Sequence, residues 1–347
     1  MTQQGSITST LSNGNRDINS VDLKVIPFAR LEEGDEATIA ALLEAGTQSG
    51  FFYLDLQHKT SQSLLNAVDD VYQLSKSLFD LTQNELITHD LDVIGPSKID
   101  GYKPAGRNTG VARGKQDGFE IYLVSTNSTL KLDPLDQPPR PKIFDLHEAL
   151  LSFIVEQLHR IGEIVLERFS SALQLPDPQS LQNAHRYGRP STSALGLLKY
   201  PPASDIDIGK LGQIAHTDVG SITVLFSRLG GLQVLQPDGE WAFVEPKPGH
   251  AVINIGDSLR FLAGKKLLSS LHRVVPHPDA QTSARFSIAY FMRPEYEAEF
   301  EDEEGKVWTG IGWHTRKFAV FRASMETQIK DSILTGRTGY LGLLENF

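Results

Sequence analysis

The pattern of apolar positions divides the chain into a mainly helical front half and a β-rich back half. Apolar residues recur at helical spacing over residues 36–49 and 64–79. The longest stripe lies in residues 143–173 and contains Leu146, Leu150, Leu151, Ile154, Leu158, Ile161, Val165 and Phe169. Short runs at 25–28 and 51–54 predict an edge strand and a buried strand. Glycine, proline and lysine interrupt residues 91–113, which predicts a loop there.

After Gly188 the pattern changes to short β-type runs separated by turn residues. The predicted strands are residues 193–200, 221–226, 232–235, 241–244, 251–255, 259–262, 271–275 and 285–292. Many short strands with regular turns are typical of a β-sandwich or barrel, and a jelly roll is a natural solution. We therefore predict an α+β fold, with a double-stranded β-helix (jelly-roll) core, flanking helices and a long central helix.

No repeat or long linker divides the chain, so we expect residues 21–347 to form one integrated domain. Within it we expect an N-terminal region at 21–135, a spine helix at 143–173, a jelly-roll core at 190–295 and a C-terminal helix at 313–334. Residues 1–20 are polar and lack the basic start and apolar stretch of a signal peptide, which predicts a disordered tail. We expect a cytoplasmic protein.

Composition narrows the chemistry further. The formal net charge of −10 argues against a nucleic-acid-binding surface, and no apolar run is long enough to cross a membrane. Part of the negative charge lies in residues 295–304, whose role the sequence does not decide. The absence of cysteine excludes disulfides, thiolate ligands and cysteine nucleophiles. Any metal site must therefore use histidine and carboxylate.

Two His-x-Asp steps are candidates for such a site, because residues i and i+2 of a strand point to the same face. His216 and Asp218 open a β-rich stretch, and His272 is available downstream as a third ligand. His277 and Asp279 flank a proline in a turn-like stretch, which favours a surface loop. Two histidines and one carboxylate on one face of a metal leave positions open, as in non-haem Fe(II) oxygenases.

Arg285 and Ser287 form a second pair at i and i+2, on the predicted strand that follows His272. A guanidinium fork and a hydroxyl together suit a buried carboxylate. The alternative is a strand arginine that is paired with a surface acid. The sequence contains neither a Gly-x-Ser-x-Gly nucleophile motif nor a glycine-rich phosphate loop.

Residues 197–294 resemble the catalytic core of the 2-oxoglutarate- and Fe(II)-dependent dioxygenases, in the isopenicillin N synthase-like branch. The matching passages occur in family order and near family spacing: LLKYPP, HTDVGSITVLF, GGLQVLQPDGEWAFVEPKPG, VINIGDSLRFLAG, LHRVVPHP and ARFSIAYFMRP. The front half resembles the family more loosely, through VIPFARL, SGFFYL and SKSLFDLTQNE.

This resemblance implies Fe(II), 2-oxoglutarate and O2 as cofactors, with ascorbate as an aid in vitro. It assigns the iron to His216, Asp218 and His272, and the distal carboxylate of 2-oxoglutarate to Arg285 and Ser287. Tyr200 matches the tyrosine of the family's Asn-x-Tyr-Pro motif and would add a hydrogen bond to the cosubstrate. Leu198 stands where that motif has its asparagine, so the amide contact is lost.

The resemblance also implies a small-molecule substrate, with specialised metabolism as our expectation, and release of succinate and CO2. Hydroxylation is the default outcome, and desaturation and ring rearrangement stay open. Candidate substrate contacts are Tyr102, Arg107, Phe119, Ile121, Phe226 and Phe291. One alternative is an Fe(II) oxidase of the same fold that does not use 2-oxoglutarate. Another is a catalytically silent binding module, against which the complete ligand set argues. We expect no nucleic-acid or membrane partner, and the oligomeric state is left open.

Overall fold

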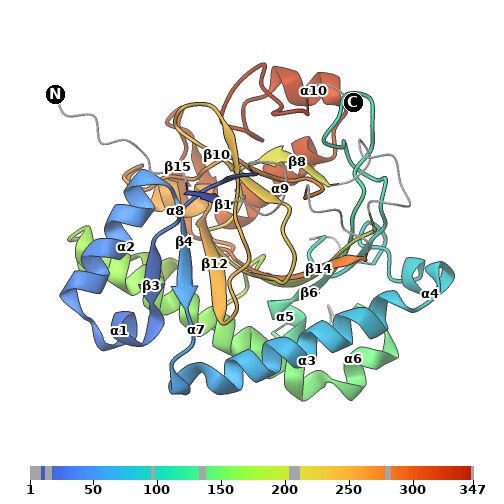
Figure 1. Ribbon diagram of the computed structural model, residues 1–347, viewed down its shortest axis with the longest axis horizontal. Coiled ribbons are helices and arrows are strands. Elements are labelled where there is room, and N and C mark those ends of the chain that lie inside the picture. The colour runs from blue at the N-terminus through green and yellow to red at the C-terminus, as the bar shows by residue number, and fades with distance from the viewer. Residues whose placement is uncertain are drawn as a thin grey trace.

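Two β-sheets form the centre of the molecule in a computed structural model that describes residues 9–11, 18–94, 98–132, 138–202, 212–277 and 283–344 (Figure 1). The larger sheet has the order β3 (Val25–Pro27), β4 (Phe51–Asp55), β12 (His250–Ile255), β9 (Ile222–Ser227), β14 (Arg285–Met292), β7 (Ala194–Tyr200), β6 (Glu120–Ser125) and β5 (Gly101–Lys103). The smaller sheet has the order β1 (Ser9–Leu11), β2 (Ile18–Ser20), β11 (Trp241–Phe243), β10 (Leu232–Leu235), β13 (His272–Val274) and β8 (Gln213–His216). The combination of large sheets and several helices confirms the predicted α+β class.

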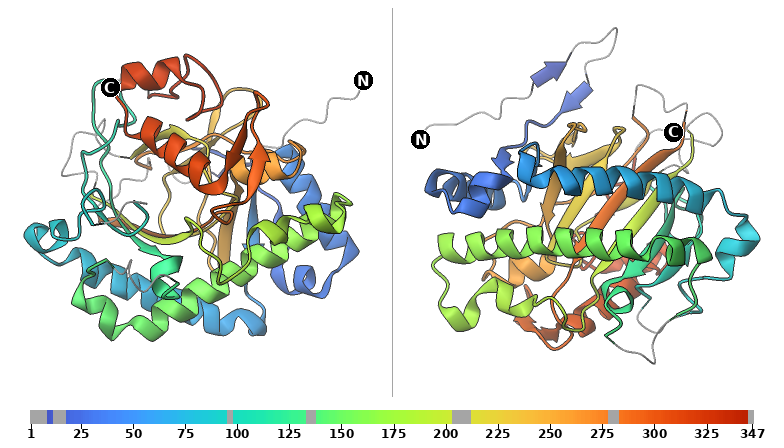
Figure 2. Two further views of the ribbon diagram at one scale, coloured as in Figure 1. Left: turned by 180° about the vertical axis from the view of Figure 1, so that it is seen from behind. Right: turned by 90° about the horizontal axis from the view of Figure 1, so that it is seen from below.

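Helices cover the outer face of the larger sheet. The helices α7 (Glu148–Ala172) and α3 (Gln62–Phe79) run side by side along it (Figure 2, right), with α1 (Phe28–Glu33) and α2 (Glu36–Gln48) packed on α7. Like the other strands of this sheet, β14 contributes alternate residues to the core: Ile288, Tyr290 and Met292 are buried. The opposite face of β14 is therefore turned toward the smaller sheet.

The predicted spine helix is divided into two. A short helix, α6 (Lys142–Leu146), precedes α7, and His147 between them has a non-helical backbone, with φ −119° and ψ 20°. The imidazole Nδ1 of His147 lies 2.8 Å from the carbonyl oxygen of Ile143. Leu146, which belonged to the predicted apolar stripe, is 83% exposed. The break rotates this end of the stripe away from the core.

The C-terminal part also differs from the sequence prediction. The expected helix at 313–334 is instead two helices, α9 (Gly310–Phe321) and α10 (Met325–Lys330), and Ser324 caps the second with its side chain. The predicted strand at 259–262 is the end of helix α8 (Asp257–Leu262). The acidic run forms one strand of the hairpin β15 (Glu299–Glu301) and β16 (Val307–Thr309). None of the helices in the described ranges is long and apolar enough to cross a membrane.

Shorter elements complete the chain: α4 (Gln83–Ile87), α5 (Thr126–Thr129), and the 3-10 helices η1 (Lys59–Ser61), η2 (Asp177–Gln179) and η3 (Leu181–Ala184). Within the predicted N-terminal tail, β2 pairs with β11 through Ser20 and Phe243, and Ser20 is buried. Residues 1–8 and 12–17 of that tail lie outside the described residues. The predicted loop at 91–113 contains β5, which pairs with β6, a strand that the sequence pattern did not predict.

Candidate active site

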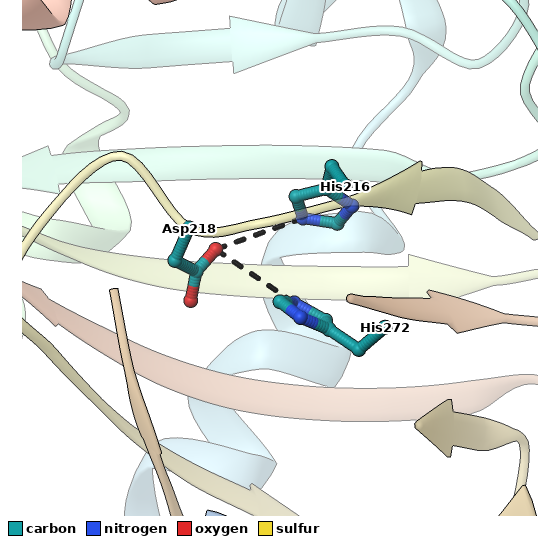
Figure 3. A group of neighbouring side chains, drawn as sticks. All are labelled: His216, Asp218 and His272. Carbon is teal, nitrogen blue, oxygen red and sulfur yellow. Dashed lines mark ion pairs between the residues drawn. The ribbon is translucent and has the colours of Figure 1, made fainter. Parts of the chain in front are cut away.

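The strands β8 and β13 bring His216, Asp218 and His272 together (Figure 3). His216 ends β8, His272 begins β13, and the two residues are direct partners in this antiparallel pair. Asp218 follows two residues after His216. Its Oδ1 lies 3.6 Å from Nε2 of His216 and 3.8 Å from Nε2 of His272. One ligand atom from each residue lies within 4.8 Å of the others, close enough for all three to bind a single metal ion.

Backbone contacts orient the two imidazoles. Nδ1 of His216 lies 2.8 Å from the Ile214 carbonyl oxygen, and Nδ1 of His272 lies 3.1 Å from that of Ser270. These carbonyls accept a hydrogen bond from Nδ1, which leaves each Nε2 as a lone-pair donor that faces Asp218. The ring of Phe51 packs edge-on against His272, with ring centroids 5.4 Å apart.

Neutral donors hold the carboxylate. Asn254 Nδ2 donates to Oδ2 of Asp218 at 2.7 Å, and the Thr223 hydroxyl donates to the same oxygen at 2.5 Å. Burial acts to raise the pKa of Asp218, but hydrogen bonding to His216, the nearby histidines and the Asn254 amide together hold that pKa well below its usual range. Burial lowers the pKa of His272 to about 4. At neutral pH the site therefore presents an ionised carboxylate and a neutral His272, which are the metal-binding forms.

Arg285 and Ser287 lie on the inner face of β14, where the register places Arg285 beside Tyr200 and Ser287 beside Leu198. Arg285 is only 2% exposed. Its Nε donates to the Leu229 carbonyl at 3.1 Å, and its guanidinium carbon lies 4.9 Å from the centroid of the Tyr200 ring. Within the described part of the chain no carboxylate forms an ion pair with Arg285. A buried guanidinium in this state has the charge and the donors that suit a ligand carboxylate.

Tyr200 and Leu198 complete this end of the site. The Tyr200 ring stacks on Phe119 with centroids 5.4 Å apart, and its hydroxyl donates to Oε1 of Gln213 at 3.4 Å. The contacts that Tyr200 makes are thus with Arg285, Phe119 and Gln213. Leu198 lines the cavity, so an apolar side chain lies where the family motif has an amide.

A cavity of about 160 Å³ lies between the two sheets and joins the His216–Asp218–His272 group to Arg285 and Ser287. Its strand wall consists of cavity-facing residues of β6, β7, β8, β9, β10, β12, β13 and β14 together with residues 217–220. Its loop wall consists of residues from the described segments 90–94, 98–119 and 317–322, the last of which contain the end of α9.

Three of the six predicted substrate residues line this cavity: Phe119, Ile121 and Phe291. The structure places the other three elsewhere, which corrects the prediction. Tyr102 is buried in the main core and donates its hydroxyl to Glu120 at 2.7 Å. Arg107 pairs with Asp90 at 2.6 Å, and Phe226 is the strand partner of Ile288 and joins it in the main core. Aromatic residues on the core face of a strand cannot reach the cavity.

The second His-x-Asp step is not beside this site. His277 is partly buried, with Nε2 at 3.4 Å from Oε1 of Glu245 and its ring 4.8 Å from that of Phe243. His277 therefore lies in an irregular segment, as predicted, but it is less exposed than the surface-loop prediction implies. Pro278 and Asp279 lie outside the described residues.

Several cavity residues were not predicted as site residues. Gln213 places Nε2 at 3.3 Å from Nε2 of His216, and Asn108 and Lys103 line the loop wall. Arg293, directly after β14, also lines the cavity. The alternation that placed Arg285 and Ser287 on one face also places residues 289, 291 and 293 there, so the sequence carried a signal for Arg293.

Comparison with known proteins gives a consistent picture. The sequence pattern of the 2OG-Fe(II) oxygenase superfamily matches residues 181–294. The chain is 34% identical to the 2-oxoglutarate-dependent dioxygenase FG08081 of Gibberella zeae, over 92% of this chain and 94% of that protein. It is 35% identical to the 2-oxoglutarate-dependent dioxygenase frbH of Dothideomycetidae sp., over 92% of this chain and 96% of that protein.

The fold has a close likeness among solved structures. A full-length Neurospora crassa protein, crystallised in complex with alpha-KG, superimposes with a TM-score of 0.70 at 22% identity, over 90% of this chain and all of that one. A 2OG-Fe(II) oxygenase family protein of Caulobacter crescentus gives a TM-score of 0.71 at 24% identity, over 86% of this chain and 98% of that one. This likeness confirms the predicted jelly-roll core.

Proposed function

Since the chain belongs to the 2OG-Fe(II) oxygenase superfamily and is a 2-oxoglutarate-dependent dioxygenase that uses Fe(II), 2-oxoglutarate and O2, we propose that it oxidises a small molecule in the cavity between its sheets. Hydroxylation is the proposed outcome, with succinate and CO2 as coproducts. We place its substrate in specialised metabolism.

One observation carries this proposal. The same cavity holds a two-histidine, one-carboxylate group whose ligand atoms lie within 4.8 Å of one another and a buried arginine that has no carboxylate partner in the described residues. The first feature fits a divalent metal with open positions, and the second fits the distal carboxylate of a dicarboxylate cosubstrate. We assign His216, Asp218 and His272 to Fe(II), and Arg285 and Ser287 to 2-oxoglutarate. Tyr200 then supports Arg285 through its ring.

When bound, the iron and its cosubstrate supply the oxidising chemistry, and the protein's residues bind, orient and exclude water. Ile214 and Ser270 keep both imidazoles in the metal-binding tautomer, and Asn254 and Thr223 occupy one oxygen of Asp218 so that the other faces the histidines. Phe119, Ile121 and Phe291 give the cavity an apolar wall that holds the substrate body and excludes water. No acid–base residue is required for this division of labour.

The alternative is a 2-oxoglutarate-independent oxidase of the same fold, in which Arg285 and Ser287 would hold a substrate carboxylate. The names of both relatives above support the 2-oxoglutarate-dependent interpretation. A silent binding module would lack a reason to retain all three ligands in metal-binding geometry.

An anaerobic titration with Fe(II) and 2-oxoglutarate tests the proposal. We expect a weak visible metal-to-ligand charge-transfer band, because the keto acid chelates the metal. His216→Ala should abolish the band, and Arg285→Met should raise the 2-oxoglutarate concentration needed to form it by roughly tenfold or more. Iron-loaded protein without a band would contradict chelation, and a band insensitive to Arg285→Met would contradict the assigned carboxylate site.

A further inference from the structure

The cavity contains a second buried arginine that the proposed chemistry does not use. Arg293 is 5% exposed and follows β14, the strand that begins with Arg285. Both arginines line the cavity, as do Ser287, Ala289 and Phe291 between them. One strand thus carries two guanidiniums to the same cavity, one from each of its ends.

The other cations of the cavity wall already have carboxylate partners. Five lysine and arginine side chains line the cavity: Lys103, Arg285, Arg293, Lys317 and Arg322. Lys103 pairs with Asp117, Lys317 with Asp257 and Arg322 with Asp92. In the ranges that the structure describes, only Arg285 and Arg293 lack such a pair, and the cosubstrate accounts for Arg285.

The hydrogen-bonding capacity of Arg293 is also unfilled. Its Nη1 donates to the carbonyl of Thr192, but its buried Nε has no hydrogen-bond partner among the described residues. A buried unpaired donor on a charged group costs free energy, so the protein itself does not fully satisfy this guanidinium. Burial lowers the pKa of Arg293 to about 10, and the group therefore stays protonated at neutral pH.

The surroundings of Arg293 leave room for this side chain. A Cβ on Gly220 would lie 2.6 Å from Cγ of Arg293, so the glycine allows the arginine to pass. The guanidinium carbon lies 5.2 Å from the centroid of the Phe291 ring and 6.0 Å from that of Phe318. Phe291 is the strand partner of Thr223, which binds Asp218. Arg293 therefore lies near the metal ligands, at the strand end opposite Arg285.

We propose that Arg293 binds the carboxylate of the substrate, and that this enzyme acts on small carboxylic acids with an apolar body. The inference rests on the proposed function, because it takes Arg285 to be filled by 2-oxoglutarate. The substrate carboxylate would receive hydrogen bonds from the guanidinium of Arg293, while Phe119, Ile121 and Phe291 contact the apolar part. Charge-assisted hydrogen bonds of this kind favour an acid over a neutral compound of the same shape.

Matched pairs of acids and alcohols test this proposal. The probes are 3-phenylpropanoate with 3-phenylpropan-1-ol, benzoate with benzyl alcohol, and octanoate with octan-1-ol. Each is titrated by anaerobic calorimetry into protein loaded with Fe(II) and saturating 2-oxoglutarate, so that Arg285 is occupied. We expect at least one acid to bind wild-type protein roughly tenfold or more tightly than its alcohol. Arg293→Met should bring the two affinities to within about twofold.

Arg322→Gln is the matched control, because Arg322 lines the same cavity but is already paired with Asp92. It should keep the preference for acids, and Arg293→Lys should keep part of it. If the Met variant does not fold, the wild-type preference and the Lys variant decide the question.

Three results would overturn the proposal: no acid preferred over its alcohol by the wild type, a preference that survives Arg293→Met, or a preference lost in Arg322→Gln. A weaker affinity of Arg293→Met for 2-oxoglutarate would also overturn it, since Arg293 would then act on the metal centre. Failure of the charge-transfer band in wild-type protein is a different result, because it contradicts the proposed function itself.

Discussion

The two walls of the cavity are held together by different forces. In the strand wall, the ligands are fixed by strand register and by hydrogen bonds from neutral groups, such as Asn254 and Thr223 on Asp218. In the loop wall, charged side chains hold segments that are far apart in the sequence. Arg107 reaches Asp90 and Asp92, and Arg322 at the end of α9 also pairs with Asp92.

This difference separates the part of the site that positions the metal-binding atoms from the part that encloses the cavity. Register and neutral hydrogen bonds depend little on salt and place the metal-binding atoms before any ligand arrives. Partly exposed ion pairs are screened by salt and contribute little each, so the loop wall can loosen without loss of the strand wall. The following experiments test this distinction, in order of decreasing expected effect.

The Lys103–Asp117 pair of the loop wall is buried, unlike the pairs of Asp92, and breaking it should have the largest effect on stability. The pair is 2.5 Å long, and its side chains are 4% and 1% exposed. Lys103→Met leaves the Asp117 carboxylate buried without its counter-ion, which should lower the free energy of unfolding by about 3–5 kcal/mol. Guanidinium denaturation measures this value. The double variant Lys103→Met/Asp117→Leu should recover most of it, and a loss below about 1 kcal/mol would show that the pair is not a fixed part of the wall.

Removing a hydrogen bond from the strand wall should weaken metal binding. Asn254→Ala deletes the 2.7 Å donor to Asp218, so the carboxylate is less firmly oriented. We expect Fe(II) affinity to fall by roughly 10–100-fold in an anaerobic titration. Asn183→Ala, which removes an exposed amide that bonds Asp177, is the control. Equal affinities of wild type and Asn254→Ala would mean that register alone orients Asp218.

Acid should lower the free energy of unfolding through His185, which contacts Ser221 next to the strand wall. His185 is 1% exposed, with Nε2 at 2.6 Å from the hydroxyl oxygen of Ser221, and burial lowers its pKa to about 4. Between about pH 6.5 and 4 the unfolded chain binds a proton at this residue that the folded chain does not. The contribution of His185 is therefore present above about pH 6.5 and is lost as pH falls, by about 2 kcal/mol between pH 7 and pH 5.

Denaturation of metal-free protein at both pH values measures this loss. His185→Asn should make the pH dependence shallower by the same amount. Burial also lowers the pKa of His272, so part of the pH dependence of stability should persist in the variant. An unchanged slope in His185→Asn would rule out this histidine as the source.

The smallest effect is expected at the partly exposed ion pairs of the loop wall. Asp92→Asn removes the partner of Lys98, Arg107 and Arg322 but should lower the free energy of unfolding by less than about 1 kcal/mol. That difference should shrink further in about 1 M salt, because screening already weakens these pairs in the wild type. A larger loss of unfolding free energy that persists at high salt would show that these ion pairs hold the loop wall as firmly as the strand wall is held.

The strand wall was largely accessible from the sequence, and the loop wall was not. The two-residue period of a strand placed Arg285 and Ser287 on one face without knowledge of any partner, and β14 has the predicted bounds. The same reasoning failed for the apolar residues 259–262, which lie in helix α8, because a run of four apolar-rich residues fits either a strand or a buried helix.

Contacts between distant segments account for several of the remaining errors. No local pattern indicates that Asp92 meets Arg322, or that Arg107 is held by Asp90 and is thus kept from the cavity. Tyr102 and Phe226 failed as substrate contacts because an aromatic residue suits a core and a binding site equally well, and only the register decides which face it occupies. The strand β8 is short and was missed, although it carries His216.

The inner face of β14 has a consequence for engineering. Ser287, Ala289 and Phe291 alternate along the cavity side of β14 between Arg285 and Arg293, and neither Ala289 nor Phe291 belongs to the proposed metal or cosubstrate set. A larger side chain at position 289 or a smaller one at position 291 should therefore change which substrates fit, while the proposed metal and cosubstrate residues stay unchanged. One strand thus offers two positions, 289 and 291, at which substitution can alter specificity between the two arginines at its ends.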